Sequence, residues 1–150
     1  MTVITMTPTP ASKVPVKSWL NLECTRVLRR ENDWVFEFGD SHNITADCPW
    51  RIIAGGRIAH ADEDDGQLFG LERPVVGSER AASLFAGKKV LSFNISEVCG
   101  DLRIEFTNET VLELWNNSSG YESWCANFKN ETQESGIVAQ GGGQIATWRR

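Results

Sequence analysis

The sequence predicts a mainly β (α+β) fold in which two antiparallel β-meanders are joined by one short helix. Residues 102–106 alternate apolar and polar side chains, which is the period of a strand with one buried face. Residues 107–110 are polar and typical of a turn, and residues 112–114 alternate again on the return. The same pattern occurs 68 positions earlier, in residues 34–38 and 44–46. We therefore expect an internal duplication that gives two equivalent hairpins.

The duplication lies within what we expect to be one domain. The chain has 150 residues, of which 41% are hydrophobic and 23% charged, and these values are typical of a soluble globular protein. Residues 1–17 are rich in Thr and Pro, which predicts a flexible N-terminal arm. Residues 18–150 predict a single β-rich domain with repeat halves at about 22–53 and 89–128 and a C-terminal hairpin at 137–148.

A long connection and one helix are expected between the two halves. Residues 58–74 show no usable period and predict an irregular loop, which in a compact domain is often functional. The helix is predicted over residues 78–86, with Ser78 as its cap and Glu79 in its first turn. Gly87 then ends it.

The charge of the chain excludes some classes of partner. The net charge is −5, and residues 61–80 carry six acidic and two basic side chains. Direct binding of nucleic acid is not expected, because phosphate contacts need a basic surface, whereas a basic protein suits this chain as a partner. No apolar run is long enough to span a membrane and no secretory signal pattern is present, so we expect a cytoplasmic protein without membrane contact. The four cysteines are widely spaced and are expected to be free thiols.

The acidic run Asp62, Glu63, Asp64 and Asp65 is the sharpest chemical feature of the sequence. It has three interpretations: a solvated loop, a surface that occupies a basic phosphate-binding groove of another protein, or a metal site. The spacing of a calcium loop is not met, because Gly66 stands at the next ligand position. If the run lies in a loop, neutralising its four side chains should leave stability nearly unchanged.

Three further residues are candidates for contacts with a partner. His60 precedes the acidic run and is expected to be an exposed loop residue. Trp50 and Trp115 lie at predicted strand ends, where an aromatic side chain can anchor a partner, although core packing is the preferred explanation for both. No nucleophile and base can be paired from the sequence, so no catalytic residue, metal or cofactor is predicted.

Four phrases of the chain resemble a family of small bacterial domains of uncharacterised function. They are the segments 34–40, 101–106, 120–124 (Gly-Tyr-Glu-Ser-Trp) and 142–148 (Gly-Gly-Gln-Ile-Ala-Thr-Trp). The resemblance spans residues 19–148, and its motifs are strands, turns and aromatic anchors, so it implies a fold and no activity.

In size, charge and lack of catalytic motifs the chain also resembles the acidic immunity proteins that bacteria encode beside secreted toxins, including those of contact-dependent growth inhibition. This second resemblance implies a non-enzymatic cytoplasmic protein that binds a cognate basic toxin domain, a nuclease, through an acidic surface. The alternative is a small-molecule or peptide-binding β module, and a hydrolase is the third interpretation.

Overall fold

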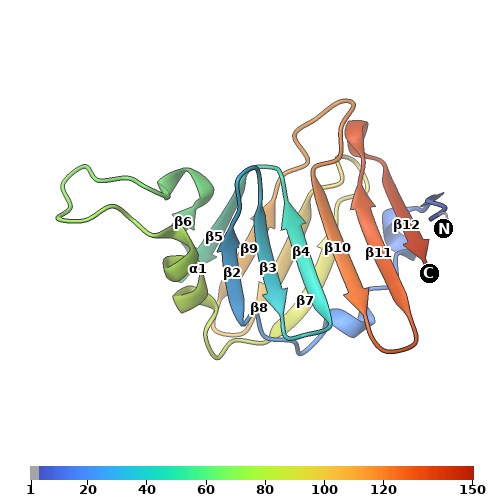
Figure 1. Cartoon of the computed structure of the whole chain (residues 1–150), viewed down its shortest axis with the longest axis horizontal. Coiled ribbons are helices and arrows are strands. Elements are labelled where there is room, and N and C mark those ends of the chain that lie inside the picture. Colours follow the sequence, from blue (N-terminus) through green and yellow to red (C-terminus); the bar gives the residue numbers. More distant parts are fainter. Residues whose placement is uncertain (1–3) are drawn as a thin grey trace.

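Two antiparallel sheets pack face to face and one helix closes one end of the molecule in the computed structural model, which describes residues 4–150 (Figure 1). The mainly β prediction is therefore confirmed. The first sheet has the order β1-β12-β11-β10-β4-β3-β2 and contains β1 (Thr7–Pro8), β2 (Arg26–Arg29), β3 (Trp34–Phe38), β4 (His42–Ala46), β10 (Trp124–Lys129), β11 (Glu134–Ala139) and β12 (Ile145–Arg149). The second has the order β6-β5-β9-β8-β7 and contains β5 (Trp50–Ala54), β6 (Arg57–Ala61), β7 (Val90–Ile95), β8 (Leu102–Phe106) and β9 (Thr110–Leu114). Helix α1 spans Gly77–Phe85, and short 3-10 turns occupy Ala11–Lys13, Lys17–Trp19, Asp62–Asp64 and Gly141–Gly143.

The core lies between the two sheets and is built from the apolar face of each strand. Every second residue of β3 and β8 points inward, as the alternating sequence requires. Across the interface the ring of Phe36 meets that of Trp50 edge-on at 5.1 Å, and Phe38 stacks on Phe106 at 6.3 Å between centroids. These are the offset and T-shaped geometries that aromatic pairs prefer.

The two predicted hairpins, β3–β4 and β8–β9, have the same register. Trp34 pairs with Ala46, and Leu102 pairs with Leu114. Each residue of the second pair lies 68 positions after its counterpart, so the sequence match is also a match of strand pairing.

After each hairpin the chain crosses to the opposite sheet. β5 follows β4 in sequence but pairs with β9, and β10 follows β9 but pairs with β4. Trp50 therefore lies opposite Leu114, while Trp124 lies opposite Ala46. Each repeat thus places its fourth and later strands in the sheet that the other repeat begins, and both tryptophans are buried in the common core.

Helix α1 and the N-terminal segment cover opposite sides of the core. Phe85 of α1 contacts Phe36 and Phe106 at centroid distances of 6.2 and 4.9 Å. Trp19 of the N-terminal segment packs against Phe38 and Phe93 beside β7. No helix within residues 4–150 has the length and apolar character needed to cross a membrane.

Two segments differ from the sequence prediction. Residues 58–74 are not irregular throughout, because β6 adds a fifth strand to the second sheet. The predicted flexible arm, residues 1–17, lies against the first sheet over the part that the structure describes: β1 pairs with β12, and Val14 is buried. The physical reason is that β12 would otherwise present an unpaired edge, which β1 covers, and Pro8 is suited to such an edge strand. Residues 1–3 lie outside the described residues.

Candidate functional site

Residues 66–76 project from the sandwich as a long loop, which we call the finger (Figure 1, green, left). Its neck is closed by two backbone hydrogen bonds, from Gly66 N–H to the Val75 carbonyl at 2.8 Å and from Val75 N–H to the Gln67 carbonyl at 2.9 Å. At its tip the Leu71 N–H donates to the Leu68 carbonyl at 2.9 Å. Gly70 sits at the third position of this turn with φ +73°, a value that glycine adopts without strain. The finger is therefore an ordered hairpin-like element.

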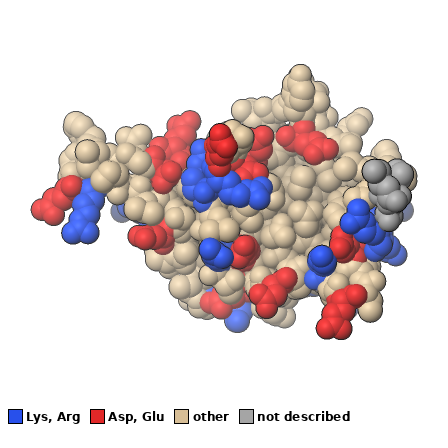
Figure 2. All heavy atoms as spheres, viewed as in Figure 1, with Lys and Arg blue, Asp and Glu red and all other residues tan. Residues whose placement is uncertain are grey.

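The tip of the finger is apolar and open to solvent. Phe69 is 99% exposed, and Leu68, Leu71 and Val76 are each roughly half exposed. Figure 2 shows that the projecting end carries few charged side chains, and the only charged residues of the finger are Glu72 and Arg73. Neighbouring exposed apolar side chains of this kind mark interaction surfaces in soluble proteins.

A groove runs between the finger and helix α1. Its volume is about 790 Å³, and its walls combine apolar residues (Leu71, Pro74, Val75, Val76) with polar and charged ones (Arg73, Glu79, Arg80, Ser83). The tip and the groove form one continuous region, because Leu71 belongs to both. A partner that covers the tip can thus also fill the groove.

The acidic run lies at the base of the finger, and part of it is committed to internal hydrogen bonds. The Asp64 carboxylate accepts from the Ala61 N–H at 3.0 Å, and the Asp65 carboxylate accepts from the Gly77 N–H at 2.8 Å, where α1 begins. Asp62 accepts from the Glu63 N–H at 2.9 Å. Of the four side chains Glu63 is exposed, and the other three are partly buried. Asp64 and Asp65 are therefore not simply solvated, and for these two residues the structure leads us to expect a loss of stability on neutralisation.

The distribution of charge also differs from a continuous acidic surface. Acidic and basic side chains are interspersed over the face shown in Figure 2. Burial raises the pKa of Asp62, and hydrogen bonds from the Glu63 and Trp50 backbones partly offset that rise. Asp62 and Glu63 border a depression of about 420 Å³ that also includes Cys48 and Pro49. These two carboxylates therefore lie where a partner that enters the depression would meet them.

His60 is buried, not exposed as the sequence suggested. Its exposed fraction is 0%, because β6 points it into the core against Trp50 at a centroid distance of 5.5 Å. Its Nδ1 lies 3.7 Å from the Asp64 carboxylate, and neither ring nitrogen has a hydrogen-bond partner within residues 4–150. Burial lowers the pKa of His60, and the charge of Arg80 lowers it further, while the charges of Asp64, Asp65 and Asp62 raise it. His60 therefore supports the base of the finger from inside.

The two candidate tryptophans lie in different environments. Trp50 is 2% exposed and contacts Trp34 and Phe36, so core packing accounts for it and it offers no surface to a partner. Trp115 is 39% exposed, and the Arg51 guanidinium lies 4.8 Å from its ring centre. The backbone N–H of Trp115 donates to the Pro49 carbonyl at 3.0 Å, which places Trp115 at the same end of the sandwich as the depression beside Asp62.

The finger itself was not among the candidates drawn from the sequence. Its signal was present in residues 68–71, Leu-Phe-Gly-Leu, an apolar group inside a segment without strand or helix period. Such a group is expected either in the core or at an interface, and only the structure shows that it lies outside the core.

Within the described chain no three His, Cys, Asp or Glu side chains are grouped so that they could hold a metal ion. Comparison with known protein families, with characterised proteins and with solved structures finds no match for this chain.

Proposed function

We propose that this protein is a non-enzymatic, cytoplasmic immunity protein that neutralises a bacterial toxin domain by binding it through the finger. The observation that carries the proposal is Phe69, a large apolar side chain that is 99% exposed at the tip of a hydrogen-bonded hairpin. An element that is already ordered loses little conformational entropy when it binds, so more of the contact energy appears as affinity.

The chemistry of the finger specifies the partner surface. Phe69 serves as the central anchor, and Leu68 and Leu71 extend the apolar contact toward the groove beside α1. Asp62 and Glu63 stand at the base of the finger as a carboxylate rim. A complementary partner has an apolar pocket bordered by Lys or Arg. The substrate cleft of a nuclease offers such a border, and insertion of the finger there would exclude the substrate.

The experiment co-expresses this protein with the C-terminal domain of a secreted toxin encoded beside its gene, and growth of the cells reports neutralisation. We expect the wild-type chain to restore growth and Phe69→Ser to lose binding by at least tenfold, about 1.4 kcal/mol. Because Phe69 is exposed, its replacement should leave the unfolding temperature unchanged.

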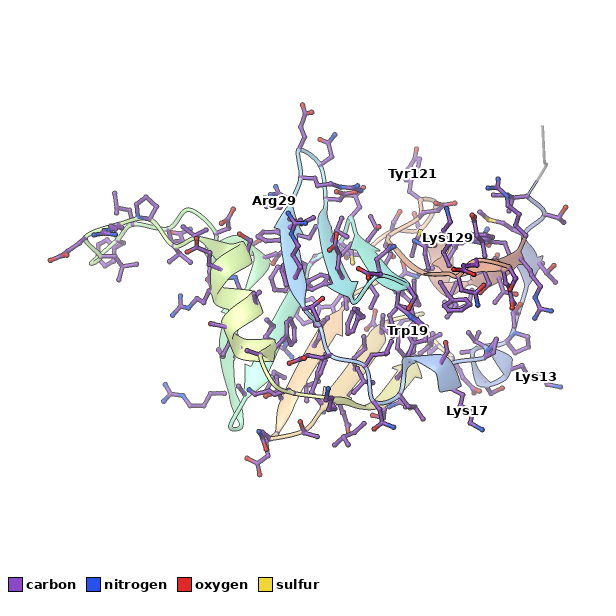
Figure 3. All side chains as sticks on the ribbon, turned by 60° about the horizontal axis from the view of Figure 1, so that its bottom comes forward. Lys13, Lys17, Trp19, Arg29, Tyr121 and Lys129 are labelled. Carbon is purple, nitrogen blue, oxygen red and sulfur yellow. The ribbon has the colours of Figure 1, made fainter. Side chains whose placement is uncertain are left out.

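The matched control is Tyr121→Ser, since Tyr121 is 81% exposed on the loop between β9 and β10, away from the finger (Figure 3). It should protect cells as well as the wild type does. Full protection by Phe69→Ser, or equal loss in both variants, would refute the finger as the binding element. A gene neighbourhood without a toxin would refute the immunity role.

A further inference from the structure

A second cleft lies at the end of the sandwich remote from the finger, between the N-terminal segment and β10–β12 (Figures 1 and 3). The first sheet has seven strands and the second has five, so the inner face of β11 and β12 has no opposing strand. The N-terminal segment crosses this face instead, and a cleft of about 640 Å³ remains beneath it. That volume falls within the range of small-molecule sites, which is about 300–1,000 Å³.

The charge of this cleft is opposite to that of the whole chain. Lys13, Lys17 and Arg149 line it, and no Asp or Glu is among its described lining residues, although the protein carries a net charge of −5. None of these three cations forms an ion pair within residues 4–150. Lys13 and Lys17 stand at the exposed rim on the N-terminal segment (Figure 3), and their flexible stems let the ammonium groups reach an occupant.

The remaining lining of the cleft combines apolar side chains with hydroxyl groups. Trp19, Ala126, Phe128 and Ile137 give it an apolar wall. Six lining residues carry hydroxyl groups: Thr5, Thr7, Thr9, Ser18, Ser135 and Thr147; Pro15, Gln133, Gly136 and Trp148 also line the cleft. Among them, the Thr9 and Thr147 hydroxyls lie 2.8 Å apart and are hydrogen-bonded. An apolar wall with a few polar groups is the usual composition of a ligand pocket.

From these features we infer that the cleft binds a small organic anion that has an apolar body and one acidic group. The apolar body would lie against Phe128 and Ile137, the hydroxyls would orient the ligand, and the acidic group would face Lys13, Lys17 and Arg149. The site shares no residue with the finger, so it is independent of the proposed toxin binding.

The test uses two fluorescent probes of similar shape and different charge. One is 1-anilinonaphthalene-8-sulfonate, and the other is N-phenyl-1-naphthylamine, which lacks the sulfonate. We expect the sulfonate to bind the full-length protein at least tenfold more tightly than the neutral probe. Added salt should weaken the binding of the sulfonate. In the protein's NMR spectrum, the signals of Trp19 and Thr147 should shift on its addition.

Two triple variants with equal loss of charge separate the cleft from general electrostatics. The combination Lys13→Gln, Lys17→Gln and Arg149→Gln should abolish the preference for the sulfonate. The combination Arg26→Gln, Arg57→Gln and Lys89→Gln removes three exposed cations outside the cleft. This variant should keep the preference for the sulfonate. The inference would be overturned if the two probes bound with equal affinity, or if both triple variants lost the preference for the sulfonate equally. Loss of sulfonate binding in Phe69→Ser would also overturn it.

Discussion

At the scale of single residues, the unusual feature is a buried histidine without a hydrogen-bond partner. Both ring nitrogens of His60 and the indole nitrogen of the neighbouring Trp50 are buried and have no partner within the described residues. An unpaired buried polar group is tolerated more easily when it is neutral, and burial lowers the pKa of His60. His42 is also buried, with a pKa lowered by the same cause, although its ring nitrogens bond to Ser41 and Ser18.

These lowered pKa values predict a stability that falls on mild acidification. The folded pKa of each histidine lies below 6.5, so the unfolded chain takes up protons first as the pH drops. Stability should be full above pH 6.5 and decrease as the pH falls below that value, and His60→Gln should make the decrease smaller. Thermal unfolding between pH 7.5 and 5.5 checks the trend, and NMR titration checks each histidine. A pKa of His60 above 6.5 in the folded protein would contradict this prediction.

The cysteines give a second prediction at this scale. All four are free thiols, and burial raises the pKa of Cys24 and Cys48 to about 12 and that of Cys125 to about 11. Cys99 alone is exposed. Because the thiolate is the reactive form, Ellman's reagent at pH 8 should modify one thiol rapidly in the native protein and four after denaturation. The variant Cys99→Ser should lose the rapid phase, and a rapid phase of two or more thiols would show that the buried sites open.

At the scale of elements, the finger is tied to helix α1 by a side chain from the acidic run. Asp65 accepts a hydrogen bond from the first N–H of α1, at the positive end of the helix dipole. Gly77 is required at that position, because a Cβ there would lie 2.8 Å from the Trp34 ring. The sequence suggested Ser78 as the cap, and the actual partner lies twelve positions before the helix, beyond the reach of local capping rules.

Replacing Asp65 should therefore destabilise the protein, whereas replacing Glu63 should not. We expect Asp65→Ala to reduce the free energy of unfolding by about 1 kcal/mol, the usual effect of losing a helix cap. Glu63→Ala is the control from the same run and should stay within about 0.5 kcal/mol of the wild type, because Glu63 is exposed. Urea denaturation measures both. Equal stabilities for the two variants would mean that Asp65 does not hold the start of α1.

The elements that could be predicted from the sequence are those whose burial follows their hydrophobic pattern. In β3 and β8 every second side chain is apolar and buried, so the hairpins β3–β4 and β8–β9 were both predicted, together with their equivalence. In β6 burial does not follow hydrophobicity, because the polar His60 is buried while the apolar Ile58 is exposed. The pairing of β6 with β5 also contains a register shift, between Ile52 and Ile53. No period-based reasoning finds such a strand. The finger and the cleft depend on which faces the sheets leave uncovered, a property of the whole fold.

At the scale of the whole molecule, the crossing of strands between the sheets joins the two repeats into one folding unit. Neither repeat contains a complete sheet, because β4 needs β10 as its neighbour and β9 needs β5. The core residues Trp50 and Trp124 are each paired with a strand of the other repeat. The duplication is visible in the sequence, but it does not correspond to two independent domains.

Separated repeats should therefore not fold alone. We expect fragments 1–88 and 89–150 each to lack cooperative thermal unfolding, and an equimolar mixture to recover it, since each supplies strands that the other requires. Circular dichroism and one-dimensional NMR of the fragments and their mixture make the measurement. A cooperative monomeric transition of fragment 1–88 by itself would contradict the interdependence of the repeats.

The pairing of β1 with β12 has a consequence for the newly made chain. The first described strand pairs with β12, which is synthesised long after it, and β4 waits for β10. Contacts between such distant parts of a sequence form slowly, and they leave strand edges open in the meantime. Until β10 and β12 have been made, the edges of β4 and β1 are open to pairing with other chains.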